Sequence, residues 1–587
     1  MRRAVLYIFA VIGGLSLLGV VGVTAVIVIA FNAAPRPAPL PGAIVLSADL
    51  DRDLAEGQGA NAVSRALFGD GMTLRDFLDA LEKAGDDPRV KGLYARLGDD
   101  TLGLARVQQV RDAIAAFRAK GKFAIAFADT FGEFGPGTRP YYLATAFDQI
   151  WLQPMGDVGL TGLYSETPFL RDALGRIGVA ADFSHRAEYK TAMNSLTESA
   201  MTAPQREEME GLLSSLDGQI VRDVAAARKI PEPDLRALID RAPLLADEAE
   251  AAHLVDKLGY RDEAIGAAQH RAGNGARFVR MSRYLDRAGH PHDSGAEIAL
   301  IYGTGMITRE GTGGSLVGAS GFDAQKVAAA IRQAAADKNI RAILFRIDSP
   351  GGSVVASETV WREIDRAHRR GKPVIVSMGD VAGSGGYYIA APADKIVAEP
   401  ATLTGSVGVL AGKIVLAGLM QRLGVNFDAV ERGANAGMFS AIEDFSPAAQ
   451  HRLDDVLDRI YAGFKNRVGN GRKLTPEAVE AVAKGRVWTG EQAKANGLVD
   501  AVGGYEVALR LAKEAANIPA DAPIDLVTLP KQKNPFAEAI DRLTGKDDTD
   551  TGLVGSRVDG IFGLIGRVEA MVTAPGTVEM PRIGEVR

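Results

Sequence analysis

An internal duplication constrains the fold of this chain more than any other feature of its sequence. The segment VKGLYARL at 90–97 is matched by IRAILFRI at 340–347, YYLATAFDQIWLQP at 141–154 by YYIAAPADKIVAEP at 387–400, and AHLVDKLGYRDEA at 252–264 by NGLVDAVGGYEVA at 496–508. The separation drifts only from 250 to 246 to 244 residues over these pairs. Solenoid repeats are about 20–50 residues long, so a unit of this length predicts two copies of a whole domain.

Each copy alternates short β-branched runs with helical patterns. AIVLSA at 43–48 opens the first copy, and EIALIYG at 297–303 opens the second. Strands that alternate with helices are typical of α/β domains with a largely parallel sheet. We therefore expect an N-terminal α/β repeat at 43–275, a linker at 276–296 and a C-terminal α/β repeat at 297–520. Residues 521–587 match nothing in the first copy and are expected to form a mostly disordered extension.

The N-terminus predicts a membrane anchor. Residues 4–31 contain no charged side chain, and a helix of that length exceeds the roughly 30 Å apolar core of a bilayer. Two arginines favour a cytoplasmic segment 1–3, so the rest of the chain should lie across the membrane, after a Pro-rich linker at 32–42. Cleavage near Asn32 is the alternative, although a cleaved signal peptide has a shorter apolar region of about 7–15 residues.

Composition excludes several classes of function. The net charge is -6 with no dense basic block, so we expect no nucleic-acid partner. The chain has no cysteine, which excludes disulfides, thiol nucleophiles and Cys-ligated metals. The seven histidines show no metal-ligand spacing. We therefore assign no metal and no other cofactor.

Ser384 is the candidate nucleophile. It lies among three glycines in GDVAGSGGYY at 379–388, directly after the apolar run at 374–376. A serine in such a setting is more often a turn residue, and a nucleophilic serine needs a base. No histidine lies near Ser384 in the sequence to serve as one.

The duplication suggests where the base is found. With the two copies laid over each other at a separation of 246 residues, Ser384 falls on Thr138 and Lys190 falls on Ala436. This reciprocal loss predicts that each repeat kept one partner of a Ser/Lys pair, and that the two meet where the repeats face each other. A lysine can act as a general base when burial lowers its pKa from about 10.4, and Ser–Lys pairs are a known variant of the catalytic triad.

Glycines near the serine are candidates for an oxyanion hole. Gly351 and Gly352 end DSPGG at 348–352, and Gly385 follows the serine at the expected start of a helix. Without side chains, their N–H groups can approach a substrate carbonyl closely. The corresponding stretch of the first copy, GDDTL at 98–102, lacks the paired glycines.

The motifs DSPGG, GSGGYYIAAPADKIVA and TLTGSVGV, in this order, resemble the signal peptide peptidase A family of membrane-bound serine proteases in its long, duplicated form. The resemblance covers roughly 43–515. It implies a Clp-protease/crotonase-like fold, with Ser384 as nucleophile, Lys190 as general base and Ser406 of TLTGSVGV orienting the lysine.

The same resemblance implies where the protein works and on what. It indicates a homotetramer anchored in the bacterial inner membrane through residues 4–31, with its catalytic part on the periplasmic side. The expected substrates are cleaved signal peptides and similar apolar peptides.

Two other functions fit part of the sequence. A crotonase-like acyl-CoA enzyme would also use Gly-rich oxyanion amides, although the membrane anchor argues against it. A non-catalytic assembly scaffold would account for the loss of the serine and the paired glycines from the first repeat.

Overall fold

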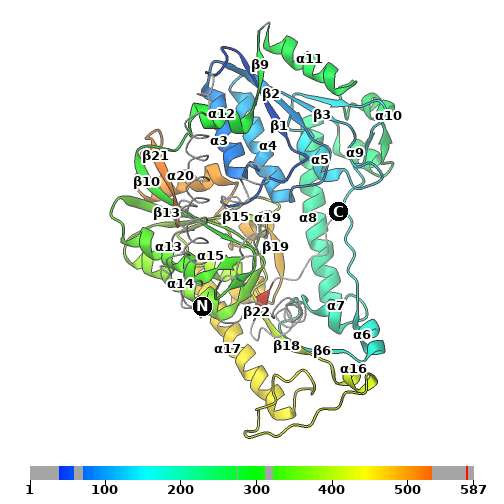
Figure 1. Ribbon diagram of the computed structural model, residues 1–587, viewed down its shortest axis with the longest axis vertical. Coiled ribbons are helices and arrows are strands. Elements are labelled where there is room, and N and C mark those ends of the chain that lie inside the picture. The colour runs from blue at the N-terminus through cyan, green and yellow to red at the C-terminus, as the bar shows by residue number, and fades with distance from the viewer. Residues whose placement is uncertain (1–38, 58–70, 274, 311–320, 532–576, 580–587) are drawn as a thin grey trace, which may run out of the picture. The chain divides into compact units, whose positions relative to one another are not determined.

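The structure is a computed structural model that describes most of the chain (Figure 1). The chain divides into two compact units, Met1–Gly42 and Ala43–Arg587, and every helix and strand described below belongs to the second. None of the helices among the described residues is both long enough and apolar enough to cross a membrane. The predicted anchor at 4–31 lies outside the described residues, which are 39–57, 71–273, 275–310, 321–531 and 577–579.

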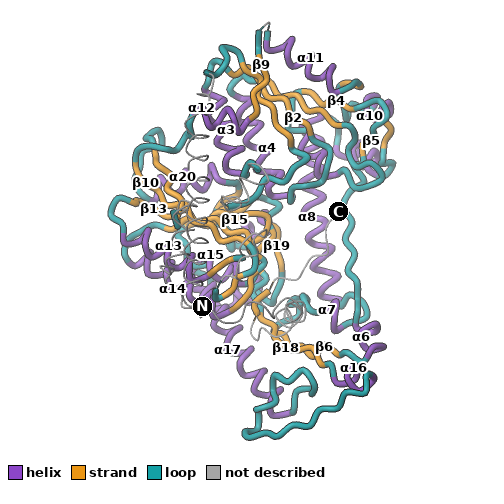
Figure 2. Tube along the Cα trace, in the orientation of Figure 1, coloured by secondary structure: helices purple, strands orange, loops and turns teal. Residues whose placement is uncertain are grey.

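The first repeat is built on a six-stranded parallel sheet with the order β8-β4-β3-β2-β1-β9. Its strands are β1 (Ile44–Asp49), β2 (Val90–Arg96), β3 (Phe123–Ala128), β4 (Gln149–Leu152), β8 (Lys257–Leu258) and β9 (Arg277–Arg280). Helices alternate with these strands along the chain (Figure 2). They are α3 (Leu74–Asp86), α4 (Leu104–Ala119), α5 (Thr138–Ala144), α10 (Ala246–Ala251) and α11 (Arg261–Ala272).

The second repeat is built on an eight-stranded sheet. Its main path is β19-β17-β15-β13-β10-β21, with β16 added to β15 and β20 to β16, and all pairs except β17 with β19 are parallel. The strands are β10 (Ala296–Thr304), β13 (Ile340–Ser349), β15 (Val374–Gly383), β16 (Lys395–Ala398), β17 (Leu403–Gly405), β19 (Val487–Thr489), β20 (Ala501–Val502) and β21 (Ile524–Leu529). The helices between them are α13 (Ala324–Ala336), α14 (Val354–Arg369), α15 (Gly385–Ala390), α19 (Gly490–Ala495) and α20 (Tyr505–Ala515).

The two sheets confirm the predicted duplication of an α/β unit. The strands β1, β2, β3 and β4 lie side by side in the same order as β10, β13, β15 and β16. The central strands are almost fully buried, as expected for parallel strands that are covered on both faces. Ile343, Phe345 and Val376 from β13 and β15 belong to one continuous apolar core.

The repeats extend beyond the limits that we expected from the sequence. The strand β9 and the helix α12 (Met281–Ala288) lie within the predicted linker at 276–296. The strand β21 lies within the predicted extension at 521–587 and pairs with β10 as β9 pairs with β1. Residues 524–529 are therefore the counterpart of β9 and belong to the second sheet.

A two-stranded ribbon joins the repeats. The strand β6 (Ala180–Arg186) of the first repeat pairs antiparallel with β18 (Val409–Val415) of the second, from Val415↔Ala180 to Val409↔Arg186. In the alignment of the two copies, β6 corresponds to residues 426–432, but no strand forms at those residues. The ribbon consists of one strand from each repeat.

A buried cation also joins the repeats. Arg346 of β13 is only 1% exposed, and its guanidinium donates to Oγ of Ser377 at 2.9 Å, the carbonyl of Met378 at 2.7 Å and Oε1 of Gln109 at 3.2 Å. It forms an ion pair with Glu56, which precedes α3 and is also buried. Glu56 and Gln109 belong to the first repeat, so the two repeats share one buried polar cluster.

A long helix follows each half of the ribbon. The helices α8 (Ala203–Arg228) and α17 (Pro447–Arg472) begin after Thr202 and Ser446, whose hydroxyl groups accept N–H hydrogen bonds from the first turn. Both end at a lysine with left-handed backbone geometry. The remaining elements are β5 (Asp157–Val158), α6 (Arg171–Ile177), α7 (Asn194–Thr197), α9 (Glu232–Ile239), β7 (Leu244–Leu245), α16 (Ala417–Arg422) and α18 (Pro476–Val482).

A small sheet flanks the DSPGG motif. The strand β14 (Gly351–Ser353) pairs with β11 (Ile307–Thr308), which pairs with β12 (Phe322–Asp323). The free edge of β14 pairs antiparallel with β22 (Thr577–Glu579), in the register Gly351↔Glu579 to Ser353↔Thr577. An extended segment of the chain therefore lies along the strand that carries the candidate oxyanion glycines.

Candidate active site

Ser384 lies in a sharp turn between β15 and α15. Its backbone has φ 53° and ψ −115°, and its side chain is fully buried. A positive φ is unfavourable for a residue with a side chain and is kept only where the surroundings impose it. The N–H of Ser384 donates to the carbonyl of Gly405 at 2.8 Å, while its carbonyl accepts from Tyr388 in the first turn of α15. The turn thus holds Ser384 at the start of a helix.

Lys190 contacts Ser384 across the junction between the repeats. Its Nζ atom lies 2.7 Å from Oγ of Ser384, and the lysine is 1% exposed. The two residues are 194 positions apart in the sequence. The distance is within hydrogen-bond range, so the structure brings together the two residues that the reciprocal loss singled out.

The β6–β18 ribbon explains how the lysine reaches the serine. Lys190 follows the end of β6, and Ser406 precedes the start of β18, so the antiparallel pairing sets the two side by side. Gly485 packs so tightly against Lys190 that a Cβ added to Gly485 would lie 2.5 Å from the backbone N atom of Lys190. Its φ of +79° is also left-handed, so a glycine is needed there.

Ser406 provides two further contacts for the lysine. Nζ of Lys190 lies 2.9 Å from Oγ of Ser406 and 3.2 Å from its carbonyl oxygen. Ser406 is fully buried and also has a positive φ of 53°. Its N–H donates to the carbonyl of Arg486 at 2.7 Å, which fixes the turn between β17 and β18.

A buried carboxyl group lies in the electrostatic environment of Lys190. Glu208 of α8 accepts a hydrogen bond from the N–H of Val487 at 2.6 Å. Burial raises the pKa of Glu208 to about 8, against the lowering effects of that hydrogen bond and of the charges on Arg486 and Lys190. A carboxyl group with this pKa is largely protonated at neutral pH, so it adds little negative charge that would favour the ammonium form of Lys190.

The candidate oxyanion glycines pack against the start of α15. A Cβ on Gly385 would lie 2.7 Å from Oγ of Ser357 and 3.2 Å from the N atom of Gly352. A Cβ on Gly352, whose φ is +150°, would lie 2.3 Å from the carbonyl oxygen of Ile307. The N–H of Gly351 already donates to Oγ of Ser349 at 3.2 Å. The N–H groups of Gly352 and Gly385 are therefore the stronger candidates for binding an oxyanion.

Comparison with known proteins places the chain among peptidases. The sequence profile of "Peptidase family S49" matches residues 117–274 and 366–519, once in each repeat. The chain belongs to peptidase family S49. It is therefore a serine peptidase of the Ser–Lys type with two ClpP/crotonase-like repeats, as the motifs suggested.

Relatives of this S49 peptidase align along most of its length. The chain is 33% identical to Protease 4 of Salmonella typhi over 78% of its own length and 75% of the relative's. It is 30% identical to the chloroplastic serine protease SPPA of Arabidopsis thaliana, over 86% and 76% of the two chains. A solved structure of the 1510-N membrane-bound stomatin-specific protease, a mutant in complex with a substrate peptide, covers 43% of this chain with 16% identity and a TM-score of 0.25.

The first repeat of this S49 peptidase has structural contacts in place of a second site. Thr138, the counterpart of Ser384, begins α5, and its hydroxyl donates to the carbonyl of Gly162 at 2.9 Å. Arg139, the counterpart of Gly385, forms an ion pair with Asp100 at 2.6 Å. These side chains fill the region where the first repeat would otherwise hold a serine and a glycine N–H group.

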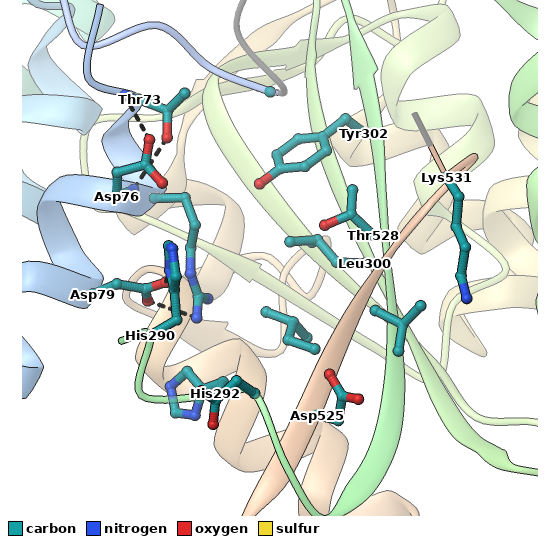
Figure 3. A pocket seen from close by; sticks show the side chains of 15 residues that line it. Thr73, Asp76, Asp79, His290, His292, Leu300, Tyr302, Asp525, Thr528 and Lys531 are labelled. Atoms are coloured by element: carbon teal, nitrogen blue, oxygen red, sulfur yellow. Dashed lines mark hydrogen bonds and ion pairs between the residues drawn. The ribbon is translucent and has the colours of Figure 1, made fainter. Parts of the chain in front are cut away.

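A cavity of about 580 Å³ lies away from the Ser384–Lys190 pair, between α3, the predicted linker at 276–296 and β21 (Figure 3). Ligand atoms of Asp79, Glu82 and His292 there lie within 4.8 Å of one another, a grouping that histidine spacing alone did not reveal. These groups have partners within the chain. Asp79 pairs with Arg75 at 2.7 Å, and Glu82 with His292 at 3.1 Å. We assign them to the packing of the linker against α3.

Sequence reasoning did not find Glu208 or the strand β22. Glu208 stands in the acidic run REEME, where nothing separates the buried carboxylate from its exposed neighbours. The strand β22 is three residues long and is defined by its pairing with β14, so no periodicity marks it.

Proposed function

We propose that the protein is a membrane-anchored endopeptidase in which Ser384 is the nucleophile and Lys190 the general base. The observation that carries this proposal is the 2.7 Å distance between Nζ of Lys190 and Oγ of Ser384 in a site shielded from water. Ser406 orients the lysine through the contacts described above.

The proposed reaction begins with a neutral Lys190 amine. It takes the proton from Oγ of Ser384 as this oxygen bonds to the carbonyl carbon of the peptide. The carbonyl oxygen becomes negatively charged and accepts hydrogen bonds from the N–H groups of Gly352 and Gly385. The lysine ammonium then gives its proton to the leaving amine, and an acyl group stays on Ser384. Water, deprotonated by the same lysine, hydrolyses this ester and restores the serine.

An extended peptide is the substrate that the site fits best. The strand β22 shows that a chain segment can pair antiparallel with β14, beside the oxyanion glycines. Peptides that add a strand to a sheet edge bind through main-chain hydrogen bonds and therefore tolerate varied sequences.

The membrane anchor narrows the proposed substrates to signal peptides. A signal peptide left after secretion is a short apolar segment in a bilayer, and an enzyme tethered by residues 4–31 would stay close to it. We place the catalytic part on the periplasmic side of a bacterial inner membrane and expect a homotetramer, as the family resemblance implies.

Single substitutions at the pair test the proposal. Ser384→Ala and Lys190→Ala should each lower kcat for a fluorogenic peptide by at least about 1000-fold, because each removes an essential group of one reacting unit. Lys413→Ala is the matched control, since Lys413 is also buried and donates to the carbonyl of Met438 at 3.0 Å. Circular dichroism would check that each variant folds. Cleavage by either folded variant at more than a tenth of the normal rate would refute the assignment.

The two other functions make different predictions. An acyl-CoA enzyme would bind coenzyme A in calorimetry, and a scaffold would leave Ser384 unmodified by a serine-reactive phosphonate. We expect no coenzyme A binding and stoichiometric labelling of Ser384 by the phosphonate.

A further inference from the structure

The strand β15 bulges just before it reaches Ser384. Its pairing with β13 shifts at Asp348, where residues 379–381 of β15 lie opposite a single residue of β13. A bulge of this kind bends a strand and redirects the side chains that follow it. The place of Ser384, which lies shortly after the bulge, therefore depends on what holds residues 379–381.

Two residues of the bulge are held within the second repeat. The carbonyl of Gly379 accepts a hydrogen bond from Oγ1 of Thr402 at 2.8 Å. The N–H of Val381 donates to Oδ1 of Asp348 at 3.0 Å. A Cβ on Gly379 would lie 2.8 Å from Cβ of Asp348, so the bulge packs closely on β13. The residue between them, Asp380, contacts the first repeat.

Asp380 binds the first turn of α4 in the first repeat. The backbone N–H of Arg106 donates to Oδ1 of Asp380 at 3.0 Å, and the guanidinium of Arg106 pairs with Oδ2. The two side chains are only 16% and 17% exposed. The helix α4 itself packs against β15 (Figure 1). Because charge-assisted hydrogen bonds are about twice as strong as neutral ones, these contacts hold the bulge firmly on the first repeat.

Asp380 replaces a cap that α4 lacks. The helix begins after Gly103, which has no side chain to accept a hydrogen bond from the first turn. A Cβ on Gly103 would overlap the carboxylate of Asp380. At the separation of 250 residues that relates β2 to β13, Gly103 corresponds to Ser353. The hydroxyl of Ser353 accepts from the N–H of Ala356 at 3.4 Å, at the start of α14. The second repeat thus caps its own helix, whereas the first takes its cap from the second.

We propose that Asp380 is a positioning residue for the nucleophile, which fixes the bulge of β15 to the first repeat and so holds Ser384 within reach of Lys190. The lysine belongs to the first repeat and the serine to the second, so their distance depends on the contacts that join the repeats near them. Asp380 acts through the strand rather than by contact with the peptide. The inference rests on the catalytic pair proposed above.

Two points fix the turn that carries the serine. One is at the turn itself, where the N–H of Ser384 donates to the carbonyl of Gly405, next to Ser406 and the β6–β18 ribbon. The other lies earlier in the chain, where Asp380 joins β15 to α4. A displacement of about 1 Å at a reacting group can cost about 100-fold in rate. Loss of the contact at Asp380 should therefore lower kcat.

A second contact supports the role of the bulge. The side chain of Val381 packs against a small apolar cluster that contains Leu212 of α8. The helix α8 is part of the first repeat and follows Lys190 in the chain. Two neighbouring residues of the bulge therefore contact the first repeat, Asp380 through its charge and Val381 through apolar surface.

The first repeat also holds the guanidinium of Arg106 on its other side. This group donates to Oδ1 of Asp53 at 2.8 Å and to the carbonyl of Leu54 at 3.2 Å. Asp53 is 58% exposed, so its ion pair with Arg106 adds little to stability. It nevertheless keeps a carboxylate beside the guanidinium, so removal of Asp380 does not leave Arg106 without a partner.

A pair of compensating substitutions separates positioning from capping. Asp380→Ala removes both the contact to the first repeat and the cap of α4, so a loss of activity in this variant alone would not distinguish the two. Adding Gly103→Ser gives α4 a cap of its own, in the backbone geometry (φ −64°, ψ 155°) that capping serines adopt. In the full-length double variant, the urea midpoint should return toward normal, while kcat for a fluorogenic peptide stays at least roughly tenfold low.

Labelling of Ser384 by a serine-reactive phosphonate gives a readout that does not need peptide binding. Its rate should fall in the double variant by about the same factor as kcat, while KM for the peptide changes little. Recovery of kcat and of the labelling rate together with the urea midpoint would show that Asp380 only caps α4, and would overturn the proposal. A wild-type protein that is not labelled at Ser384 would instead refute Ser384 as the nucleophile.

Two single variants complete the test. Gly103→Ser alone places a Cβ where the carboxylate of Asp380 lies, so it should lower kcat severalfold without lowering the urea midpoint. Unchanged kcat in this variant would overturn the proposal, and it decides the question if the double variant does not fold. Asp53→Asn is the matched control, because it removes the exposed partner of Arg106 and leaves Asp380 in place; kcat should stay within about twofold. A loss in Asp53→Asn as large as in the double variant would count against a specific role of Asp380.

Discussion

The substitution Ser406→Ala tests how the lysine is held. A neutral amine has two N–H groups and one lone pair, and the contacts of Lys190 Nζ within the described residues include three with serine oxygens. Two of these are with Ser406, at Oγ and the carbonyl oxygen, and the third is with Oγ of Ser384. If both contacts to Ser406 use N–H groups, the lone pair is directed at Ser384, which is the orientation that a general base needs.

The size of the effect follows from the loss of one contact. Ser406→Ala removes the 2.9 Å contact and leaves the backbone contact at 3.2 Å. A net hydrogen bond is worth about 0.5–1.5 kcal/mol, and the freed amine can rotate its lone pair away from Ser384. With tenfold in rate for each 1.36 kcal/mol, we expect kcat to fall by about 2-fold to 13-fold. KM should change little, because Ser406 acts through the lysine rather than on the peptide.

The assay compares kcat and KM for a fluorogenic peptide with those of Thr404→Ala. Thr404 is equally buried on β17, two residues before Ser406, and donates to the carbonyl of Ala382 at 2.7 Å, but no contact joins it to Lys190 among those described. A loss of kcat shared by both variants would indicate general disruption of the turn. An unchanged kcat in Ser406→Ala, or a loss as complete as in Lys190→Ala, would refute an orienting role.

Two further predictions concern the junction between the repeats and the C-terminal segment. Glu56→Gln should lower the free energy of unfolding in urea by roughly 3 kcal/mol, because it leaves the buried charge of Arg346 uncompensated. Adding Arg346→Met should recover much of that loss. A loss below about 1 kcal/mol in Glu56→Gln would contradict this reasoning. Truncation after Lys531 removes β22, the strand that pairs with β14, and should lower KM for added peptides several-fold at unchanged kcat, because the peptides no longer compete with β22. Removal of residues 580–587 alone should leave KM unchanged. Equal KM values in the two truncated proteins would show that β22 does not compete with substrate.

The duplication made the close approach of Ser384 and Lys190 predictable from one sequence. Two copies of a domain share a backbone, so a constant separation in sequence marks equivalent positions in space. The spacing between Thr138 and Lys190 equals that between Ser384 and Ala436. The comparison of the copies therefore singles out Ser384 and Lys190 together, although either residue alone would be taken for an ordinary turn or surface residue. The predicted sheets followed from the same comparison, and both are present.

Pairings between distant segments could not be predicted in this way. The strand β21 is a short edge strand, and its place beside β10 depends on a partner more than 200 residues earlier. The ion pair of Arg346 with Glu56 joins the repeats, whereas Arg96, the counterpart of Arg346 in the first copy, pairs with Asp51 and Asp129 of its own repeat. Propensity and periodicity describe local preference, whereas these contacts are selected by packing between segments.

The ribbon links the proposed catalytic pair to the docking of the two repeats. Lys190 is positioned by β6, and Ser406 is positioned by β18, so any slip between these strands would move the amine away from Ser384. A slip of one residue would also turn every side chain of the strand to the opposite face. Such a register is well protected when both strands are anchored, and Arg186 anchors β6 to α17 through two carboxylates. The proposed site is divided between the two repeats and therefore needs a rigid junction, which the pairing of β6 with β18 provides.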